Sequence, residues 1–97
     1  MGIIIEFSAN QHIVVTGNDV SGNSTGGIAL QTSSNIIVRY NTANDNGTYG
    51  IQADGGSNNN LIRRNTAMGN TFDLANLGQN NCFRHNHYVT SEGPIGC

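Results

Sequence analysis

A phrase built around asparagine recurs along this 97-residue chain at a spacing of 21 to 24 residues. One copy spans residues 35–46 and combines a β-branched run, an Asn, a small residue and a polar turn. The dipeptide Gly27-Ile28 recurs 23 residues later as Gly50-Ile51. The leading asparagines of successive copies are separated by 23, 24 and 21 residues: Asn18, Asn41, Asn65 and Asn86. A repeat of this length without helical periodicity is typical of a solenoid with one coil per repeat.

The composition agrees with a narrow solenoid. Only 36% of residues are apolar and 10% are charged, while roughly one residue in six is Asn. Such a composition also occurs in disordered chains, but here the asparagines keep register with the apolar positions. The net charge of −2 offers no electrostatic basis for binding nucleic acid or an anionic membrane. No segment is long enough to span a bilayer, and the apolar run at residues 3–5 is too short for a signal peptide.

Aligning the repeats predicts one all-β domain with coils at residues 2–25, 26–49, 50–71 and 72–91 and a carboxyl-terminal tail at 92–97. The first strand of each coil is expected at Ile5-Glu6-Phe7, Ile28-Ala29-Leu30, Ile51-Gln52-Ala53 and Phe72-Asp73-Leu74. Their alternation places Glu6, Gln52 and Asp73 in solvent. The inward residues of the second strand are expected to be Val15, Val38, Ile62 and Phe83. Those of the third are expected to be Val20, Ala43, Ala67 and Tyr88.

Stacked coils place equivalent residues about 4.8 Å apart, which is the distance between hydrogen-bonded strands. The leading asparagines would then form a ladder in which each side-chain amide bonds its copy one coil away. We therefore expect Asn18, Asn41, Asn65 and Asn86 to be structural residues with no role in ligand binding.

Two segments resemble the parallel β-helix repeats of right-handed, pectate-lyase-like β-helix proteins. They are residues 34–43 (Ser-Asn-Ile-Ile-Val-Arg-Tyr-Asn-Thr-Ala) and 59–67 (Asn-Asn-Leu-Ile-Arg-Arg-Asn-Thr-Ala). The resemblance implies a single right-handed parallel β-helix of about four coils, expected to be the carboxyl-terminal portion of a longer helix. Members include polysaccharide lyases, hydrolases, uronate epimerases, phage tailspikes and copper-pathway periplasmic proteins. No catalytic motif of the family matches this chain residue by residue.

Two sets of charged residues are candidate sites. Arg39, Arg63 and Arg84 share one outward position and could bind an anionic polysaccharide, although stacked arginines also serve as a solvated face. Asp54 and Asp73 are expected on the outer face of adjacent coils, where paired carboxylates can act as acid and base or bind calcium. Their offset of two positions weakens that interpretation.

We expect neither a metal nor a cofactor. His85 and His87 alternate on a strand, but the bend at Asn86 between them spoils a shared metal geometry. Cys82 and Cys97 are expected to form a disulfide, which favours an extracellular or periplasmic location over the alternative of two free thiols in a cytosolic protein.

The sequence favours a non-catalytic solenoid scaffold or self-associating module that could contact polysaccharide along one face. The alternative is a fragment of a polysaccharide lyase, hydrolase or uronate epimerase. Self-association, as a dimer or a stacked filament, is expected through the uncovered amino-terminal coil or through an apolar stripe on the second strand. The stripe consists of Val14, Ile37, Leu61 and Cys82.

Overall fold

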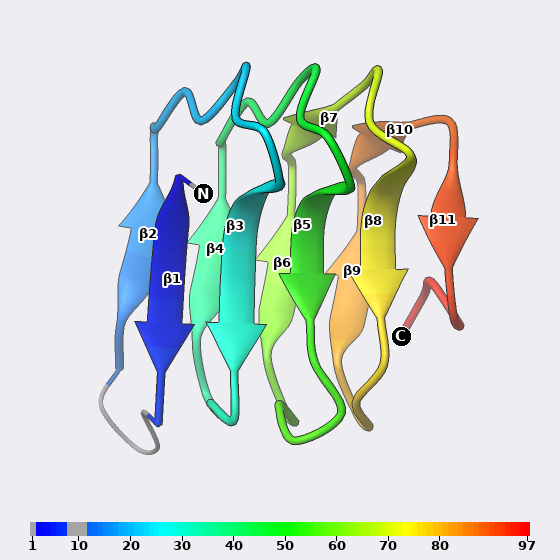
Figure 1. The fold of residues 1–97 in the computed structure, drawn as a ribbon. Coiled ribbons are helices and arrows are strands. Elements are labelled where there is room, and N and C mark those ends of the chain that lie inside the picture. The colour runs from blue at the N-terminus through cyan, green and yellow to red at the C-terminus, as the bar shows by residue number, and fades with distance from the viewer. Residues whose placement is uncertain (1, 8–11) are drawn as a thin grey trace.

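The computed structural model describes residues 2–7 and 12–97, in which every regular element is a β-strand (Figure 1). The chain winds through about four turns of a parallel β-solenoid, which confirms the predicted fold class. The strands are β1 (Ile3–Glu6), β2 (Val14–Thr16), β3 (Gly26–Gln31), β4 (Ile37–Arg39), β5 (Tyr49–Ala53), β6 (Leu61–Arg63), β7 (Thr66–Ala67), β8 (Phe72–Asn76), β9 (Cys82–Arg84), β10 (His87–Tyr88) and β11 (Ser91–Glu92).

Equivalent strands of successive coils lie side by side in three parallel sheets. The first sheet has the order β1-β3-β5-β8-β11, the second has the order β2-β4-β6-β9, and β7 pairs with β10 in the third. Figure 1 shows the five-stranded sheet in front and the four-stranded sheet behind it. Each coil therefore contributes one strand to each of the two larger sheets.

The pairing register in the first coil differs from the predicted one. Ile3 pairs with Ile28, whereas the alignment had placed Ile5 opposite Ile28. As a result Phe7, which we expected to point inward, is 77% exposed. A strand pattern repeats every two residues, so a shift by two leaves the alternation intact and the sequence alone does not detect it.

The fourth coil shows the same two-residue shift. The alignment had placed Phe72 opposite Ile51, but Leu74 pairs with Ile51 and Phe72 pairs with Tyr49, two residues earlier. Asp73, predicted to face solvent, is only 1% exposed. The prediction for Asp73 was wrong because this residue belongs to a side-chain ladder, as described below, and not to the outer face of the strand.

The core is a narrow stack of aliphatic side chains. Its fully buried members come from the second, third and fourth coils and include Ile28, Leu30, Val38, Ile51, Ile62 and Leu74. Burying one such side chain contributes about 1.5–3 kcal/mol. The residues predicted to point inward from the second strand are buried, as are Val20, Ala43 and Ala67. Tyr88 is an exception at 38% exposed, because β10 is the last strand of its sheet.

The predicted asparagine ladder is present and has a fixed direction. Asn41 Oδ1 accepts hydrogen bonds from Asn18 N and Nδ2 at 2.9 and 3.1 Å. Asn41 N and Nδ2 donate in turn to Asn65 Oδ1 at 2.9 and 3.0 Å. Asn65 makes the same pair of bonds to Asn86 Oδ1 at 2.9 and 3.1 Å. Each coil thus donates to the side-chain oxygen of the next coil.

A corner with left-handed backbone precedes each ladder asparagine. Tyr40 has a φ of 54° before Asn41, and Arg64 has a φ of 54° before Asn65. Glycine fills the equivalent corner in the first coil, at Gly17. The left-handed conformation costs a residue with a Cβ roughly 1–2 kcal/mol. The buried ladder bonds that follow each corner offset this cost.

Two further ladders run parallel to the first. In one, Asn23 and Asn46 lead through Asn70 to Asp73, whose Oδ1 accepts from Asn70 N and Nδ2 at 3.0 and 2.9 Å. In the other, Asn60 N and Nδ2 donate to Asn81 Oδ1, both at 3.0 Å. The ladder of Asn60 and Asn81 was not predicted, because the earlier coils carry Ile13 and Ile36 at this position.

The tail closes the carboxyl-terminal end of the solenoid. β11 pairs with β8, and Asn76 Nδ2 then donates to Pro94 O at 2.8 Å. Phe83 N, on the other large sheet, donates to Gly96 O at 2.9 Å. Ile95 packs against the core cluster. The predicted disulfide between Cys82 and Cys97 fixes the end of the tail to β9.

Candidate anion-binding face

Three arginines occupy one register position on adjacent strands of the four-stranded sheet. Arg39 of β4 pairs with Arg63 of β6, and Arg63 pairs with Arg84 of β9. The first coil has Thr16 at this position. Because neighbouring strands lie about 4.8 Å apart, the three side chains start from evenly spaced points. We call Arg39, Arg63 and Arg84 the arginine row.

A second column of outward residues borders the arginine row. It consists of the corner residues Tyr40, Arg64 and His85, each of which directly follows a member of the row. All three are exposed, and Tyr40 is 55% exposed. The left-handed backbone at these residues, with φ between 54° and 57°, turns the chain out of the strand. Cationic and aromatic groups therefore lie together along one edge of the sheet.

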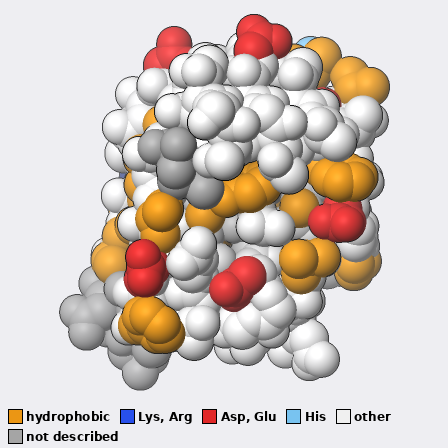
Figure 2. Space-filling view, viewed as in Figure 1, with side chains coloured by type: hydrophobic (Ala, Val, Ile, Leu, Met, Phe, Trp, Pro, Cys, Tyr) orange, Lys and Arg blue, Asp and Glu red, His pale blue; other side chains and the backbone are white. Residues whose placement is uncertain are grey.

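Positive charge is confined to this face. The four Lys and Arg residues of the whole chain are Arg39, Arg63, Arg64 and Arg84, and all lie in these two columns. None of the six acidic residues belongs to β4, β6 or β9 or to the corners that follow them. Figure 2 shows the opposite face, over the five-stranded sheet, with carboxylates and apolar side chains and almost no Lys or Arg. The net charge of −2 therefore conceals a local cationic surface.

Arg39 carries an unsatisfied donor. Its Nε is buried and has no hydrogen-bond partner among the described residues. Arg39 and Arg63 are half-buried and Arg84 is exposed. Like charges directly opposite one another on a sheet destabilise it, by about 1 kcal/mol for two unit charges 4 Å apart in bulk water. An anion placed across the row would relieve this repulsion and supply acceptors.

An apolar column lies two residues before the arginine row on the same face. Its members pair in register as predicted: Val14, Ile37, Leu61 and Cys82. Val14 is 43% exposed, and the other three are half-buried. The outer face of this sheet thus combines an apolar stripe with a row of cations.

The two carboxylates considered for catalysis are separated and engaged in structure. Asp54 follows the end of β5, and its Oδ1 accepts from Thr32 N, Gly56 N and Ser57 Oγ at 3.0, 3.0 and 2.8 Å. Asp73 lies at the opposite end of its coil's strand, inside a ladder. An acid and base pair needs both groups to reach one substrate. The predicted placement of both on one outer face was therefore wrong.

Asp73 is held as a carboxylate by its surroundings. Its Oδ2 accepts from Val89 N and Thr90 N, each at 3.0 Å, in addition to the two bonds from Asn70 at Oδ1. Burial alone would raise the pKa of this carboxyl, but the hydrogen bonds from Thr90, Asn70 and Val89 outweigh it and lower the pKa. Asp73 is thus the acceptor that ends one ladder.

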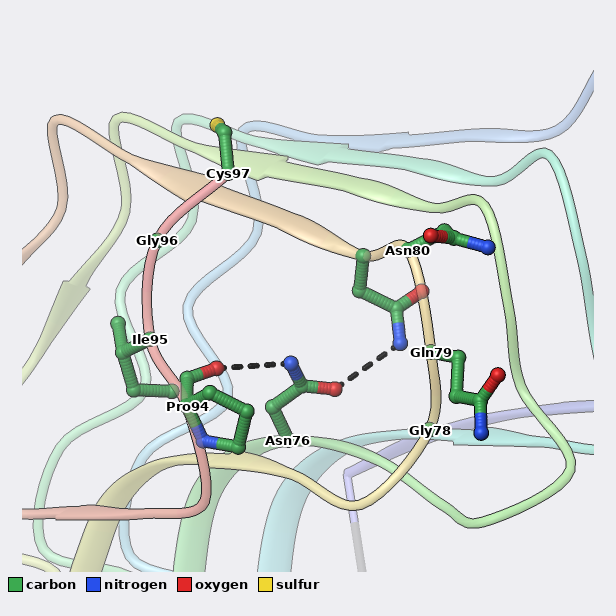
Figure 3. Close-up of a pocket in the computed structure, with 9 residues that line it drawn as sticks. Asn76, Gly78, Gln79, Asn80, Pro94, Ile95, Gly96 and Cys97 are labelled. Carbon is green, nitrogen blue, oxygen red and sulfur yellow. Dashed lines mark hydrogen bonds between the residues drawn. The ribbon is translucent and has the colours of Figure 1, made fainter.

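An open hollow of about 490 Å³ lies where the tail crosses the last coil. Figure 3 shows Asn76 at its centre, where Nδ2 donates to Pro94 O at 2.8 Å and Oδ1 accepts from Asn81 Nδ2 at 3.0 Å. Because these amides bond to each other and to the tail, the hollow is a junction of structural elements. The hollow was not predicted from the repeats, since it depends on the path of the tail.

Three other findings bear on the nature of the site. Residues 2–7 and 12–97 contain no group of three or more His, Cys, Asp or Glu that could hold a metal ion. In the same residues no helix is long and apolar enough to cross a membrane. The disulfide is a feature common in proteins of oxidising compartments and rare in cytosolic ones.

Comparison with known proteins agrees with this architecture. The family model described as "right handed beta helix region" matches residues 2–95. No curated protein and no solved structure matches the chain. The family match covers nearly the whole sequence, and its description fits the parallel coils seen in the structure. The chain therefore belongs to the family of right-handed β-helix proteins.

Proposed function

We propose that this protein is a non-catalytic β-helix scaffold that binds an anionic polysaccharide along the arginine row. The observation that carries the proposal is the confinement of every Lys and Arg of the chain to two adjacent columns of one sheet. A polymer with carboxylate or sulfate groups could meet several of these cations at once, whereas a single small anion would meet one or two.

Guanidinium groups suit this role because they present a planar fork of donors. An arginine can bind a carboxylate or sulfate through two parallel hydrogen bonds, and such charge-assisted bonds are roughly twice as strong as neutral ones. Tyr40 adds an exposed ring beside the row, on which a sugar face could pack.

The engagement of the carboxylates supports a binding role over catalysis. Asp54 forms three hydrogen bonds in its own turn, and Asp73 receives four. Neither lies beside the arginine row. A polysaccharide lyase, hydrolase or uronate epimerase would need an acid or base near the bound chain. We further propose an extracellular or periplasmic location, where the disulfide would persist.

The experiment is titration of the protein with polygalacturonate, with heparin and with neutral dextran by isothermal calorimetry. We expect the two anionic polymers to bind and dextran not to bind. Arg63→Gln removes the central cation, and the loss of a hydrogen bond to a charged group, about 1.5–3 kcal/mol, predicts a 10- to 100-fold loss of affinity. Arg63→Lys should recover only part of it, because a lysine cannot form the paired bonds.

Gln52→Glu is the matched control, since it makes the same change in net charge on the opposite sheet. It should change the affinity less than twofold. Equal losses for Arg63→Gln and Gln52→Glu would show that only net charge matters and would contradict the proposal. Binding of dextran or of a single-stranded polynucleotide as tightly as polygalacturonate would contradict it too. Cleavage of the polyuronate during the titration would replace it with the enzymatic alternative.

A further inference from the structure

The amino-terminal face of the solenoid has edges that can pair with another coil. β1 and β2 are edge strands of the two large sheets. Gly2 N donates across to Gly26 O of the next coil at 3.1 Å. Phe7 N donates to Gln31 O of β3 at 3.0 Å, and backbone groups alternate in direction along the paired residues of β1, so the N–H group of Ile4 points to the other side. The side chains of Ile3 and Ile5 are only half-buried against the core.

The main asparagine ladder is open at both ends, with opposite polarity. Asn18 Oδ1, in the first coil, accepts no hydrogen bond from a described residue, whereas Asn41 Oδ1 and Asn65 Oδ1 each accept two. In the last coil Asn86 Nδ2 donates back to Ile62 O at 2.9 Å, but Asn86 N has no acceptor among the described residues. One end thus presents an acceptor and the other a donor.

The tail occupies the positions that a following coil would take. In the five-stranded sheet β11 already pairs with β8, and in the four-stranded sheet Gly96 O accepts from Phe83 N. The ladder that contains Asn70 ends on Asp73, whose Oδ2 accepts hydrogen bonds from Val89 N and Thr90 N. The tail does not pair with β10, the strand that follows the corner at Asn86. The tail is held by contacts along its length and by the disulfide to Cys82.

We propose that the amino-terminal face is a docking surface for the carboxyl-terminal end of a second copy of this chain, and that the tail competes with that copy. With the tail displaced, Asn86 N would donate to Asn18 Oδ1 of the next molecule and continue the ladder. β1 would pair with β8, and β2 with β9, as successive coils already do within the chain. Because this head-to-tail contact stacks each molecule on the next along the solenoid axis, it does not close into a ring and the product is a filament.

The first experiment compares the oxidised full-length chain with the same chain after treatment with a dithiol reductant. The dithiol is oxidised to its own disulfide, and Cys82 and Cys97 become thiols, which alkylation and mass spectrometry count. Light scattering and electron microscopy then report assembly. The oxidised chain should show no filaments at 100 µM, roughly the concentration used for such assays. The reduced chain should assemble, with scattering rising at least tenfold.

A second variant releases the tail without relying on reduction. A chain that ends at Thr90 and carries Cys82→Ser lacks β11 and the rest of the tail but keeps the bonds between Thr90 and Asp73. It should form filaments with or without reductant. Circular dichroism checks that this variant keeps its β structure, and if it does not, the reduced full-length chain decides the question.

Matched substitutions on the amino-terminal face identify the surface. Ile4→Pro deletes an N–H that points away from β3, which an edge strand tolerates, and Ile4→Val is the control that keeps it. We expect the tail-released chain to assemble with Ile4→Val and to stay monomeric with Ile4→Pro. Ile37→Lys, in the apolar stripe of the four-stranded sheet, should have no effect on this assembly.

Three results would overturn the proposal. The first is filament formation by the oxidised chain at the same level as by the reduced chain. The second is a chain that stays monomeric when both thiols are free and also when the tail is absent from a folded variant. The third is assembly that Ile37→Lys blocks and Ile4→Pro leaves intact, which would assign the contact to the apolar stripe instead.

Discussion

Replacing Asp73 with asparagine tests the hydrogen bonding at the end of a ladder, where one side chain accepts four hydrogen bonds. At the other ladder positions described above, the side chain is the amide of an asparagine. Asp73 instead faces four N–H donors, two from Asn70 and one each from Val89 and Thr90, at 2.9 to 3.0 Å. An amide there would turn its own NH₂ group toward two of these donors, whichever way it is oriented.

The cost follows from the bonds lost. Two hydrogen bonds to a charged acceptor contribute about 1.5–3 kcal/mol each. Val89 and Thr90 are exposed, so water can satisfy their N–H groups in part. We therefore expect Asp73→Asn to lower the free energy of unfolding by about 2–4 kcal/mol at pH 7, a value worked from these terms. Urea denaturation followed by circular dichroism measures it.

The lowered pKa of Asp73 determines how the stability difference between the native protein and Asp73→Asn changes with pH. The pKa of Asp73 is lower in the folded chain than its ordinary value near 3.9, so the unfolded chain takes up this proton first as the pH falls. The stabilisation is complete at neutral pH and is lost below about pH 4. The difference between the native protein and Asp73→Asn should shrink accordingly from pH 7 to pH 2.5.

Asp45→Asn is the matched control, because Asp45 is an exposed corner residue with a φ of 57° that asparagine also adopts readily. It should change the stability by less than about 0.5 kcal/mol, as surface substitutions usually do. If Asp73→Asn destabilises no more than Asp45→Asn, or if its effect does not depend on pH, the account of the ladder end is wrong.

Three further predictions concern the rest of the fold. Asn41→Leu should lower the melting temperature well below that of Asn44→Leu, because the buried Asn41 side chain accepts from Asn18 N and donates to Val15 O; similar temperatures in differential scanning calorimetry would contradict this. Cys97→Ser should cost roughly 3 kcal/mol in the entropic estimate for a 15-residue loop, measured by urea denaturation, and a loss under 1 kcal/mol would show that the tail holds without its disulfide. Gly50→Ala should reduce the yield of folded protein, since a Cβ there would lie 2.6 Å from a backbone oxygen, and unchanged expression and melting would refute it.

Most of the architecture could be predicted from the sequence, because the recurring asparagines can hydrogen-bond one another only if successive coils stack in register. The spacing of Asn18, Asn41, Asn65 and Asn86 fixed the coil length, and the ladder then required equivalent residues to stack. The arginine row followed from the same alignment, since its members lie two residues before a ladder asparagine in each of three coils. The disulfide between Cys82 and Cys97 is also as predicted.

The errors have two physical causes. Alternation with a period of two cannot distinguish registers two residues apart, which misplaced Phe7 and Phe72. The roles of Asp73 and of the hollow beside Asn76 depend on the path of the tail. The tail is not a copy of the repeat, so its path could not be predicted by aligning it with the earlier coils. How anionic groups would lie across the arginine row also depends on side-chain placement, which the register alone does not define.

At the left-handed corners the backbone conformation is constant, while the exposed side chain differs from coil to coil. The corner before the main ladder holds Gly17, Tyr40, Arg64 and His85 in successive coils, yet the three that carry a side chain keep a φ within 54–57°. The asparagine that follows maintains this conformation, so the corner residue itself is free to vary in size, charge and aromaticity. One substitution per coil can thus change the charge and aromaticity of the outer surface while the fold stays the same. Glycine would be the most stable occupant of each corner, and every other residue there trades stability for surface chemistry.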